Sequence, residues 1–157
     1  MELLGKPAIN PWLFYTGKIS GYIVWAGFVY SLCYDDLITG IDFYGRDIIA
    51  YGMFVLGLVI SMVSLLYLGR SVRFGLPTEK TVLKTKGLYR YSRNPIYVGF
   101  GFLTIASMLQ TRNIFIIILG VFSLVVYHLI ILSEESFLLT RFGKNYERYM
   151  QNVRRYI

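Results

Sequence analysis

The sequence predicts an all-α protein: a polytopic membrane helix bundle of about four transmembrane helices, with a cytoplasmic loop and a C-terminal amphipathic helix. Hydrophobic residues make up 55% of the 157 residues, and the mean hydropathy is +0.53. Four apolar stretches are long enough to cross a bilayer core of about 30 Å at a rise of about 1.5 Å per residue. Apart from Lys18 in the first stretch, which is expected to reach the nearby membrane interface, the charged residues collect between and beyond these stretches. A single membrane domain is therefore expected.

The expected spans are residues 12–33, 48–69, 95–111 and 113–133. The second carries no charge, whereas the third is the shortest and would have to stand upright or thin the bilayer locally. Gly17 and Gly21 are four residues apart in the first span, and Gly57 and Ser61 in the second. Small residues at this spacing let helix backbones approach closely in lipid, so both pairs predict helix packing.

The charge distribution predicts the orientation of the chain. The 69–95 connection and the residues after 133 are rich in Lys and Arg, whereas the connection between the first two spans is acidic. By the positive-inside rule, both termini and the 69–95 loop are expected in the cytoplasm. The net charge of +7 thus indicates contact with the bilayer, and the four apolar spans exclude a soluble nucleic-acid-binding protein.

We divide the single domain, 1–157, into two N-terminal spans (1–69) and a hairpin with its loop and C-terminal helix (70–157).

A short connection predicts a helical hairpin near the C-terminus. Only residues 110–113 separate the third span from the fourth, so the two must run antiparallel. The start of one span then lies beside the end of the other, which makes Asn94 and Pro95 neighbours of Glu134 and Glu135. Proline suits the first turn of a helix, so Asn94 is expected at the N-cap, next to free N–H groups that favour an anion.

An amphipathic helix is expected beyond the hairpin. Its apolar residues recur at three- and four-residue steps, and the opposite face is basic. It would lie on the inner leaflet or fold over the hairpin. The apolar residues are Leu138, Phe142, Tyr146, Tyr149, Met150 and Val153.

Two carboxylates at the end of the fourth span are the first candidates for a functional role, because charges at a membrane helix are costly and usually have a partner or a function. Glu134 and Glu135 point about 100° apart on a helix, so only one can face fully inward. They either pair with Arg93 or Arg141 as interfacial residues, or one of them binds a cation in a partly dry cavity.

Other candidates carry weaker signals. His128 stands without Cys or further His at ligand spacing, so no metal site is expected, and it either makes a structural hydrogen bond or lines a substrate pocket. Gly99 and Gly101 lie about 200° apart on a helix, so either the span packs on both sides or one glycine makes room for a bulky ligand. Together the residues predict a cytoplasm-facing cavity at the membrane boundary, suited to a cationic or zwitterionic cofactor and an amphiphile.

The second half of the chain resembles the isoprenylcysteine carboxyl methyltransferases and is similar to the wider group that includes phospholipid N-methyltransferases. The resemblance covers about residues 81–157. It rests on the run from Gly87 through Arg93, Asn94 and Pro95 to Gly99, on Glu134-Glu135, and on the aromatic pattern from 142 to 153. It implies S-adenosylmethionine as methyl donor, acting with a lipophilic acceptor from the bilayer.

The resemblance also implies a set of site residues. The family's cofactor-binding glutamate falls on Glu134, and the Gly-x-Gly of phospholipid methyltransferases falls on Gly99 and Gly101. The loop and the Asn-Pro corner would hold the rest of the cofactor through Thr81, Val82, Leu83, Lys84, Tyr89, Arg93, Asn94, Pro95, Ile96 and Tyr97. Glu135, His128 and Arg141 are the candidates for catalysis, with Glu135 or His128 as the base if the acceptor is a protonated amine.

Two departures bear on the acceptor. Asn94 stands where many relatives have His, and Ile130 stands where prenylcysteine enzymes have an arginine for the substrate carboxylate, a role open here to Arg141 or Arg93. The predicted function is methyl transfer to a lipophilic acceptor, most like isoprenylcysteine carboxyl O-methylation. The alternatives are a phospholipid or small-amphiphile N- or S-methyltransferase and a non-catalytic membrane scaffold.

Overall fold

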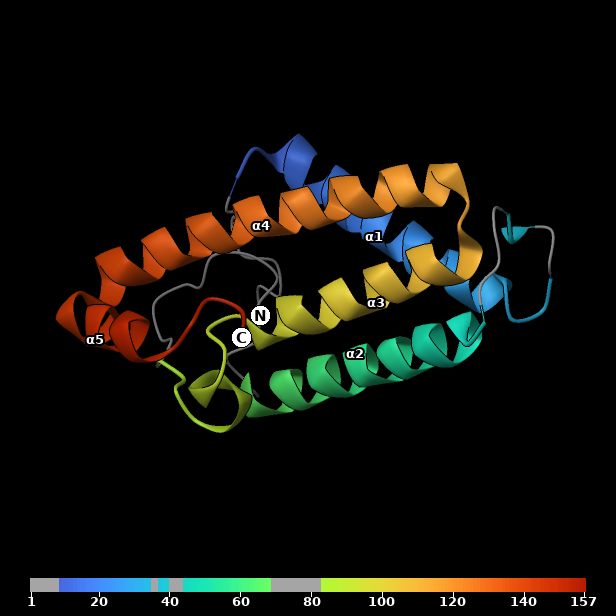
Figure 1. Ribbon diagram of the computed structural model, residues 1–157. Helices are drawn as coiled ribbons and strands as arrows, with labels where there is room; N and C mark the ends of the chain where they lie inside the picture. The colour runs from blue at the N-terminus through green and yellow to red at the C-terminus, as the bar shows by residue number, and fades with distance from the viewer. Residues whose placement is uncertain (1–8, 35–36, 40–43, 69–82) are drawn as a thin grey trace.

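The computed structural model describes residues 9–34, 37–39, 44–68 and 83–157. Thr81 and Val82 therefore lie outside the described residues. The described chain is helical, with no strand beyond an isolated bridge between Ser92 and Arg154, which confirms the all-α class. Its elements, drawn in Figure 1, are α1 (Pro11–Tyr30), α2 (Arg46–Leu68), a 3-10 helix η3 (Gly87–Arg90), α3 (Pro95–Thr111), α4 (Ile114–Phe142) and α5 (Lys144–Asn152).

The four long helices coincide with the four expected spans. By length and composition, α2 and α4 are each able to cross a membrane, and α3 is a shorter apolar helix of 17 residues. Helix α1 has 20 residues, a length of about 30 Å, but carries Lys18 near its middle. The existence of all four helices is confirmed, while a full crossing by α1 and α3 stays a prediction.

Small residues bring the helices together in two pairs, as the spacing predicted. A Cβ atom on Gly57 would lie 2.8 Å from the Gly99 carbonyl oxygen, so α2 and α3 touch backbone to backbone. A Cβ atom on Gly17 would lie 2.5 Å from Val126 Cβ, and one on Gly21 would collide with the Tyr127 hydroxyl. Both glycines therefore allow α4 to pack closely against α1.

The α3–α4 hairpin is open at one end. Its turn is closed by Arg112 in the left-handed conformation (φ 50°) and by Asn113, whose side chain caps α4 by accepting a hydrogen bond from Phe115 N. Beyond this turn α3 packs most extensively against α2, and α4 against α1. The two hairpin helices separate along their length (Figure 1), so their far ends are connected through side chains and through the C-terminal segment.

The C-terminal amphipathic pattern is divided between two helices rather than forming one. Helix α4 continues to Phe142 and ends at Gly143, which adopts φ 48°, a conformation open to glycine. Helix α5 then turns back and packs the expected apolar residues into one cluster with Leu83 from the preceding loop. The apolar face of α5 therefore packs within the protein, against the end of α4 and the preceding loop.

The contact between α2 and α3 gives a test of the fold. We expect Gly99→Ala to lower stability by about 1–3 kcal/mol, because the added methyl group would meet Gly57 O at 2.8 Å and Ser61 N at 2.9 Å, which are backbone atoms. The thermal unfolding midpoint in detergent would measure this. Gly52→Ala is the matched control, since a Cβ atom there meets nothing within 4 Å. Equal midpoints for the two variants would contradict the described packing.

Candidate functional site

A buried carboxylate, Glu135, ties three segments together at the open end of the hairpin. Its side chain is 5% exposed. Asn94 Nδ2 donates to Oε1 at 3.0 Å, and Arg155 Nε donates to Oε2 at 3.0 Å. Arg93 Nε lies 3.4 Å from Oε1 and adds a second cation. The expectation that the Asn-Pro corner meets the acidic pair is confirmed, and the pairing alternative holds for Glu135, with Arg155 as an additional partner.

The C-terminal segment is bound along its backbone to the same corner. Arg93 N donates to Arg154 O at 2.9 Å, and the Arg155 carbonyl oxygen accepts from Asn94 Nδ2 at 3.2 Å and from Ser92 Oγ at 3.3 Å. In Figure 1 the chain returns from α5 to end beside the start of α3. The C-terminal residues therefore form part of the site rather than a free tail.

Asn94 occupies the N-cap position of α3 but does not cap the helix with its side chain. No hydrogen bond joins its side chain to the first turn. The reason is that its amide donates to Glu135 and to the Arg155 carbonyl oxygen. Pro95 fills the first helical position, as expected. The corner thus uses Asn94 to connect segments rather than to begin the helix.

Tyrosines lock α5 to the loop. Tyr149 Oη donates to the Tyr89 carbonyl oxygen at 2.6 Å. Burial raises the pKa of Tyr149 to about 12, so its hydroxyl keeps the proton it donates at neutral pH. Burial also raises the pKa of the Tyr89 phenol. The hydrogen bond from the Tyr149 side chain to the Tyr89 backbone therefore joins α5 to η3 without a charged group.

The other carboxylate, Glu134, faces a different set of residues. Tyr97 Oη donates to Glu134 Oε1 at 3.0 Å, which joins α3 to α4. Lys18 of α1 interacts electrostatically with Glu134, and its Nζ lies 4.0 Å from the centre of the Phe14 ring. Because neighbouring helical residues point about 100° apart, Glu135 meets the corner while Glu134 meets α1 and Tyr97.

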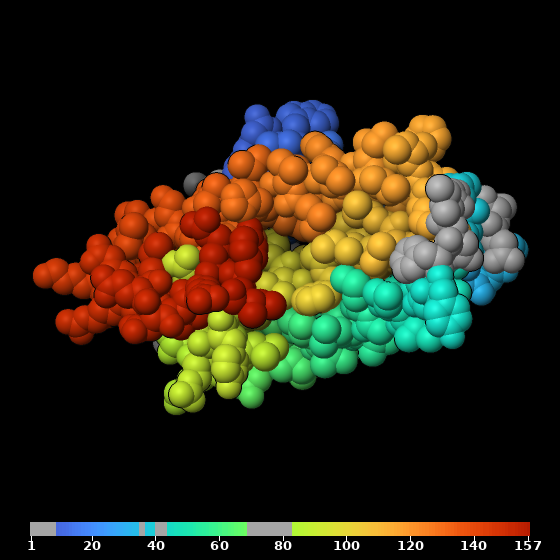
Figure 2. All heavy atoms as spheres, in the orientation of Figure 1, coloured from blue at the N-terminus to red at the C-terminus, as the bar shows by residue number. Residues whose placement is uncertain are grey.

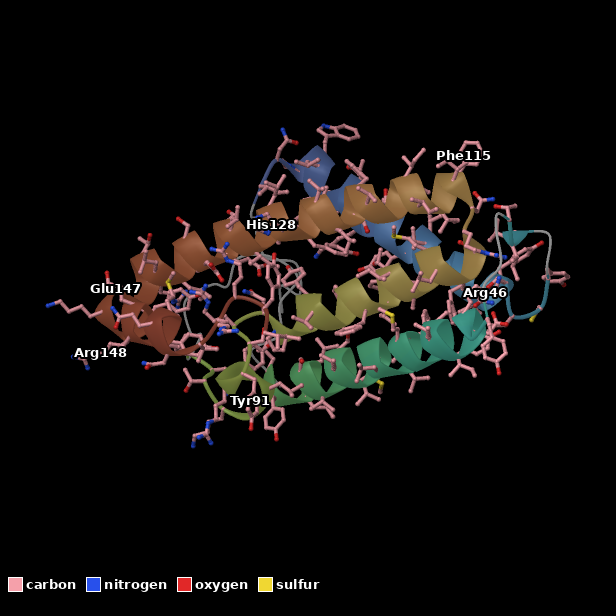
Figure 3. The ribbon with its side chains drawn as sticks, in the orientation of Figure 1. Arg46, Tyr91, Phe115, His128, Glu147 and Arg148 are labelled. Carbon is pink, nitrogen blue, oxygen red and sulfur yellow. The ribbon has the colours of Figure 1, made fainter. Side chains whose placement is uncertain are left out.

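An apolar cavity of about 420 Å³ lies between α3, α4 and the chain end. In Figure 2 the yellow surface of α3 lies recessed between orange α4 and the red C-terminal residues. His128 Nδ1 and Tyr156 Oη share a hydrogen bond of 2.6 Å at its wall, and Figure 3 shows His128 on the length of α4 between Phe115 and α5. The lining residues are Tyr97, Val98, Gly101, Phe102, Ile105, Leu124, Tyr127, His128, Ile131, Tyr156 and Ile157.

The structure groups some predicted site residues and separates others. Tyr97 touches both Glu134 and the cavity, and His128 and Gly101 line the cavity. Gly99 packs against α2, Leu83 packs against α5, Pro95 is buried, Ile96 is half-buried and Lys84 is exposed. Arg141 lies about 10 Å along α4 from Glu134 with its guanidinium over the Phe142 ring, and it does not line the cavity.

Four residues of the site were missed by reasoning from the sequence: Lys18, Ser92, Arg155 and Tyr156. The sequence predicts that Lys18 reaches the membrane interface; in the structure its Nζ lies over the Phe14 ring, and the residue interacts electrostatically with Glu134. Ser92, Arg155 and Tyr156 gave no sequence signal, because their partners depend on the return of the chain end to the corner.

Known proteins are similar to the part of the chain that contains the α3–α4 hairpin. Residues 46–145, from the start of α2 into α5, match the family described as phospholipid methyltransferase. The chain belongs to this family. The match leaves out α1 and the C-terminal segment, so Lys18, Arg155 and Tyr156 lie outside it. Family membership, together with the two long apolar helices, identifies an integral membrane protein.

Two individual proteins are similar to the chain. The protein-S-isoprenylcysteine O-methyltransferase of Schizosaccharomyces pombe is 30% identical over 110 residues, which are 66% of this chain and 46% of that protein. The solved structure of a eukaryotic intramembrane Ras methyltransferase, isoprenylcysteine carboxyl methyltransferase, matches with a TM-score of 0.66 and 27% identity, over 92% of this chain and 52% of that one. The chain spans about half the length of each.

The contacts of Glu135 predict how firmly the chain end is held. We expect Glu135→Gln to speed tryptic release of Tyr156–Ile157 by about tenfold or more, because losing one member of a buried ion pair costs about 3–5 kcal/mol. Mass spectrometry of the intact protein during limited digestion would measure the rate. Glu147→Gln is the matched control, since Glu147 is exposed on α5 (Figure 3). Equal release from both variants would show that Glu135 does not hold the segment.

Proposed function

We propose that the chain is an S-adenosylmethionine-dependent methyltransferase that modifies a lipophilic acceptor at the cytoplasmic face of the membrane. One observation carries the proposal. Tyr97 binds the Glu134 carboxylate through its hydroxyl group and lines the apolar cavity with its ring, so the acidic site and the cavity share a wall. A donor and an acceptor bound on the two sides of this residue would be held next to each other, which is the main requirement of a transfer reaction.

The proposed donor site, at Arg93 and Glu134, fits a zwitterionic cofactor because it contains a buried polar atom without a hydrogen-bond partner in the described part of the chain. Arg93 Nη1 is buried and has no hydrogen-bond partner among the described residues. A carboxylate is the natural ligand for such a guanidinium nitrogen, while the Glu134 carboxylate suits a positive group. When bound, S-adenosylmethionine supplies a methyl group on a positively charged sulfur. In our proposal Glu134 and Arg93 hold its opposite charges, and Tyr89, Asn94 and Tyr97 orient it.

The protein's contribution to the reaction is to exclude water and to place the acceptor. Glu135, held by Asn94 and Arg155, keeps the chain end across the open hairpin. A carboxylate or thiolate acceptor needs no base. For a protonated amine, His128 is the better placed of the predicted bases, since it lines the cavity. Both oxygens of Glu135 already accept hydrogen bonds, which favours a positioning role for it.

Support for an anionic acceptor, such as a prenylcysteine carboxylate, comes from Lys18. Ile130, where an arginine would be expected in a prenylcysteine enzyme, is fully buried and packs with Phe14 of α1. Lys18 lies one turn after Phe14 and interacts electrostatically with Glu134. Lys18 thus places a positive charge on α1 beside Phe14, the residue that packs with Ile130. This makes carboxyl O-methylation of an isoprenylcysteine our first candidate.

A phospholipid or small-amphiphile N-methyltransferase is the second candidate, and His128 in the cavity wall favours it.

Both candidate functions require the same orientation of the protein in the membrane. The basic loop, α5 and the chain end would face the cytoplasm, and the end that carries Arg46 and Phe115 in Figure 3 would face the opposite side. The exposed Lys84, Lys86, Arg90, Lys144 and Arg148 agree with this orientation.

Cofactor binding tests the donor site. We expect Glu134→Gln to weaken binding of S-adenosylmethionine about tenfold or more, since a hydrogen bond to a charged group is worth about 1.5–3 kcal/mol. Isothermal titration of the purified protein would measure Kd, with Glu147→Gln as the control for loss of an exposed carboxylate. Undiminished binding by Glu134→Gln would remove Glu134 from the site. Absence of binding by the unaltered protein would favour the non-catalytic scaffold.

The acceptor class has its own test. Membranes containing the protein would be incubated with methyl-labelled S-adenosylmethionine, prenylcysteine analogues and aminophospholipids. Under the first candidate we expect base-labile methyl esters, which Lys18→Met should reduce to background although it still binds the cofactor. Label that is stable to base and found in lipid headgroups would support the second candidate and reject the first.

A further inference from the structure

The two glycines of the Gly-x-Gly pair have different surroundings. A Cβ atom on Gly99 would lie 2.8 Å from Gly57 O and 2.9 Å from Ser61 N, so this glycine is required for helix packing. A Cβ atom on Gly101 would meet nothing within 4 Å, although the residue lies in the middle of α3. Because Gly101 is also part of the cavity lining, the missing side chain leaves free volume that belongs to the cavity.

The chemistry of the cavity suits an apolar chain. Among the described residues that line it there is no Asp, Glu, Lys or Arg, and most are aliphatic or aromatic. A volume of about 420 Å³ lies within the range of about 300–1,000 Å³ found for ligand pockets. The polar pair His128–Tyr156 stands at one wall. A charged cofactor would find no partner for its charges here, whereas a hydrocarbon chain loses nothing by being surrounded with apolar groups.

We propose that Gly101 is a specificity-determining residue that sets the length of the apolar chain accepted by this cavity. The inference rests on the proposed function, because the chain in question is that of the methyl acceptor. It also assigns Gly101 to the acceptor instead of to the cofactor, the role that the family resemblance implies for it. The apolar chain lies along α3 past Gly101 toward Ile105 and Leu124, and a side chain at position 101 blocks that path.

Photo-crosslinking tests the inference without relying on methyl transfer. Cysteine probes with S-geranyl or S-geranylgeranyl chains, each with a terminal diazirine, would be irradiated with the purified protein, and labelled residues identified by mass spectrometry. A fatty-acyl diazirine probe serves as the comparison for bulk lipid chains. In the unaltered protein we expect the geranylgeranyl probe to label cavity residues such as Ile105 and Leu124.

The variants are Gly101→Leu, Gly101→Ala and the matched control Gly52→Leu, which adds the same side chain to an exposed glycine of α2 with nothing within 4 Å. Gly101→Leu should lower labelling by the geranylgeranyl probe about tenfold or more relative to the geranyl probe, since one methylene in an apolar pocket is worth about 1–3 kcal/mol. Gly101→Ala should give a smaller decrease in the same direction, and Gly52→Leu none.

Several results would overturn the inference. These are equal labelling of Gly101→Leu and Gly52→Leu, an equal decrease for both chain lengths, or stronger cavity labelling by the fatty-acyl probe than by the prenyl probes. Loss of S-adenosylmethionine binding by a folded Gly101→Ala would return Gly101 to the cofactor site. Chain-length-selective labelling by a protein that transfers no methyl group would refute the proposed function and leave the cavity assignment intact.

Discussion

The architecture of the site depends on one buried carboxylate. Removing an ion such as Glu135 from water carries an effective penalty of several kcal/mol, so the charge must be met by well-placed donors. Here the donors come from two segments far apart in sequence, Asn94 and Arg93 before α3 and Arg155 at the end of the chain. The same interaction therefore compensates the charge, joins the open end of the hairpin and holds the final residues in place.

That connection permits a hairpin whose helices are not packed along their whole length. Close glycine contacts bind α3 to α2 and α4 to α1, which draws the two hairpin helices toward different neighbours. The space left between them is closed at one end by the turn at Arg112 and at the other by the residues that Glu135 anchors. An apolar cavity beside a polar site follows from this geometry.

Adjacent carboxylates divide two tasks between them. Glu135 is saturated by the corner and the chain end, while Glu134 faces Tyr97 and Lys18 on the other side of α4. In our proposal, this division separates the residue that maintains the shape of the site from the one that would meet a positively charged ligand. Tyr97 then stands between the carboxylate and the cavity, where the proposed donor and acceptor sites would meet.

Apolar length, glycine spacing and the short 110–113 connection are local properties, so the sequence by itself determined the four helices, their close contacts and the meeting of Asn94 with Glu135. Only the tertiary structure decided that Gly143 divides the C-terminal helix, that Arg155 returns to Glu135, that Lys18 lies near Glu134, and that Gly99 packs while Gly101 opens a cavity. The physical reason is that a helix fixes the direction in which each side chain points. The residue that the side chain contacts depends instead on which segment of the folded chain lies in that direction.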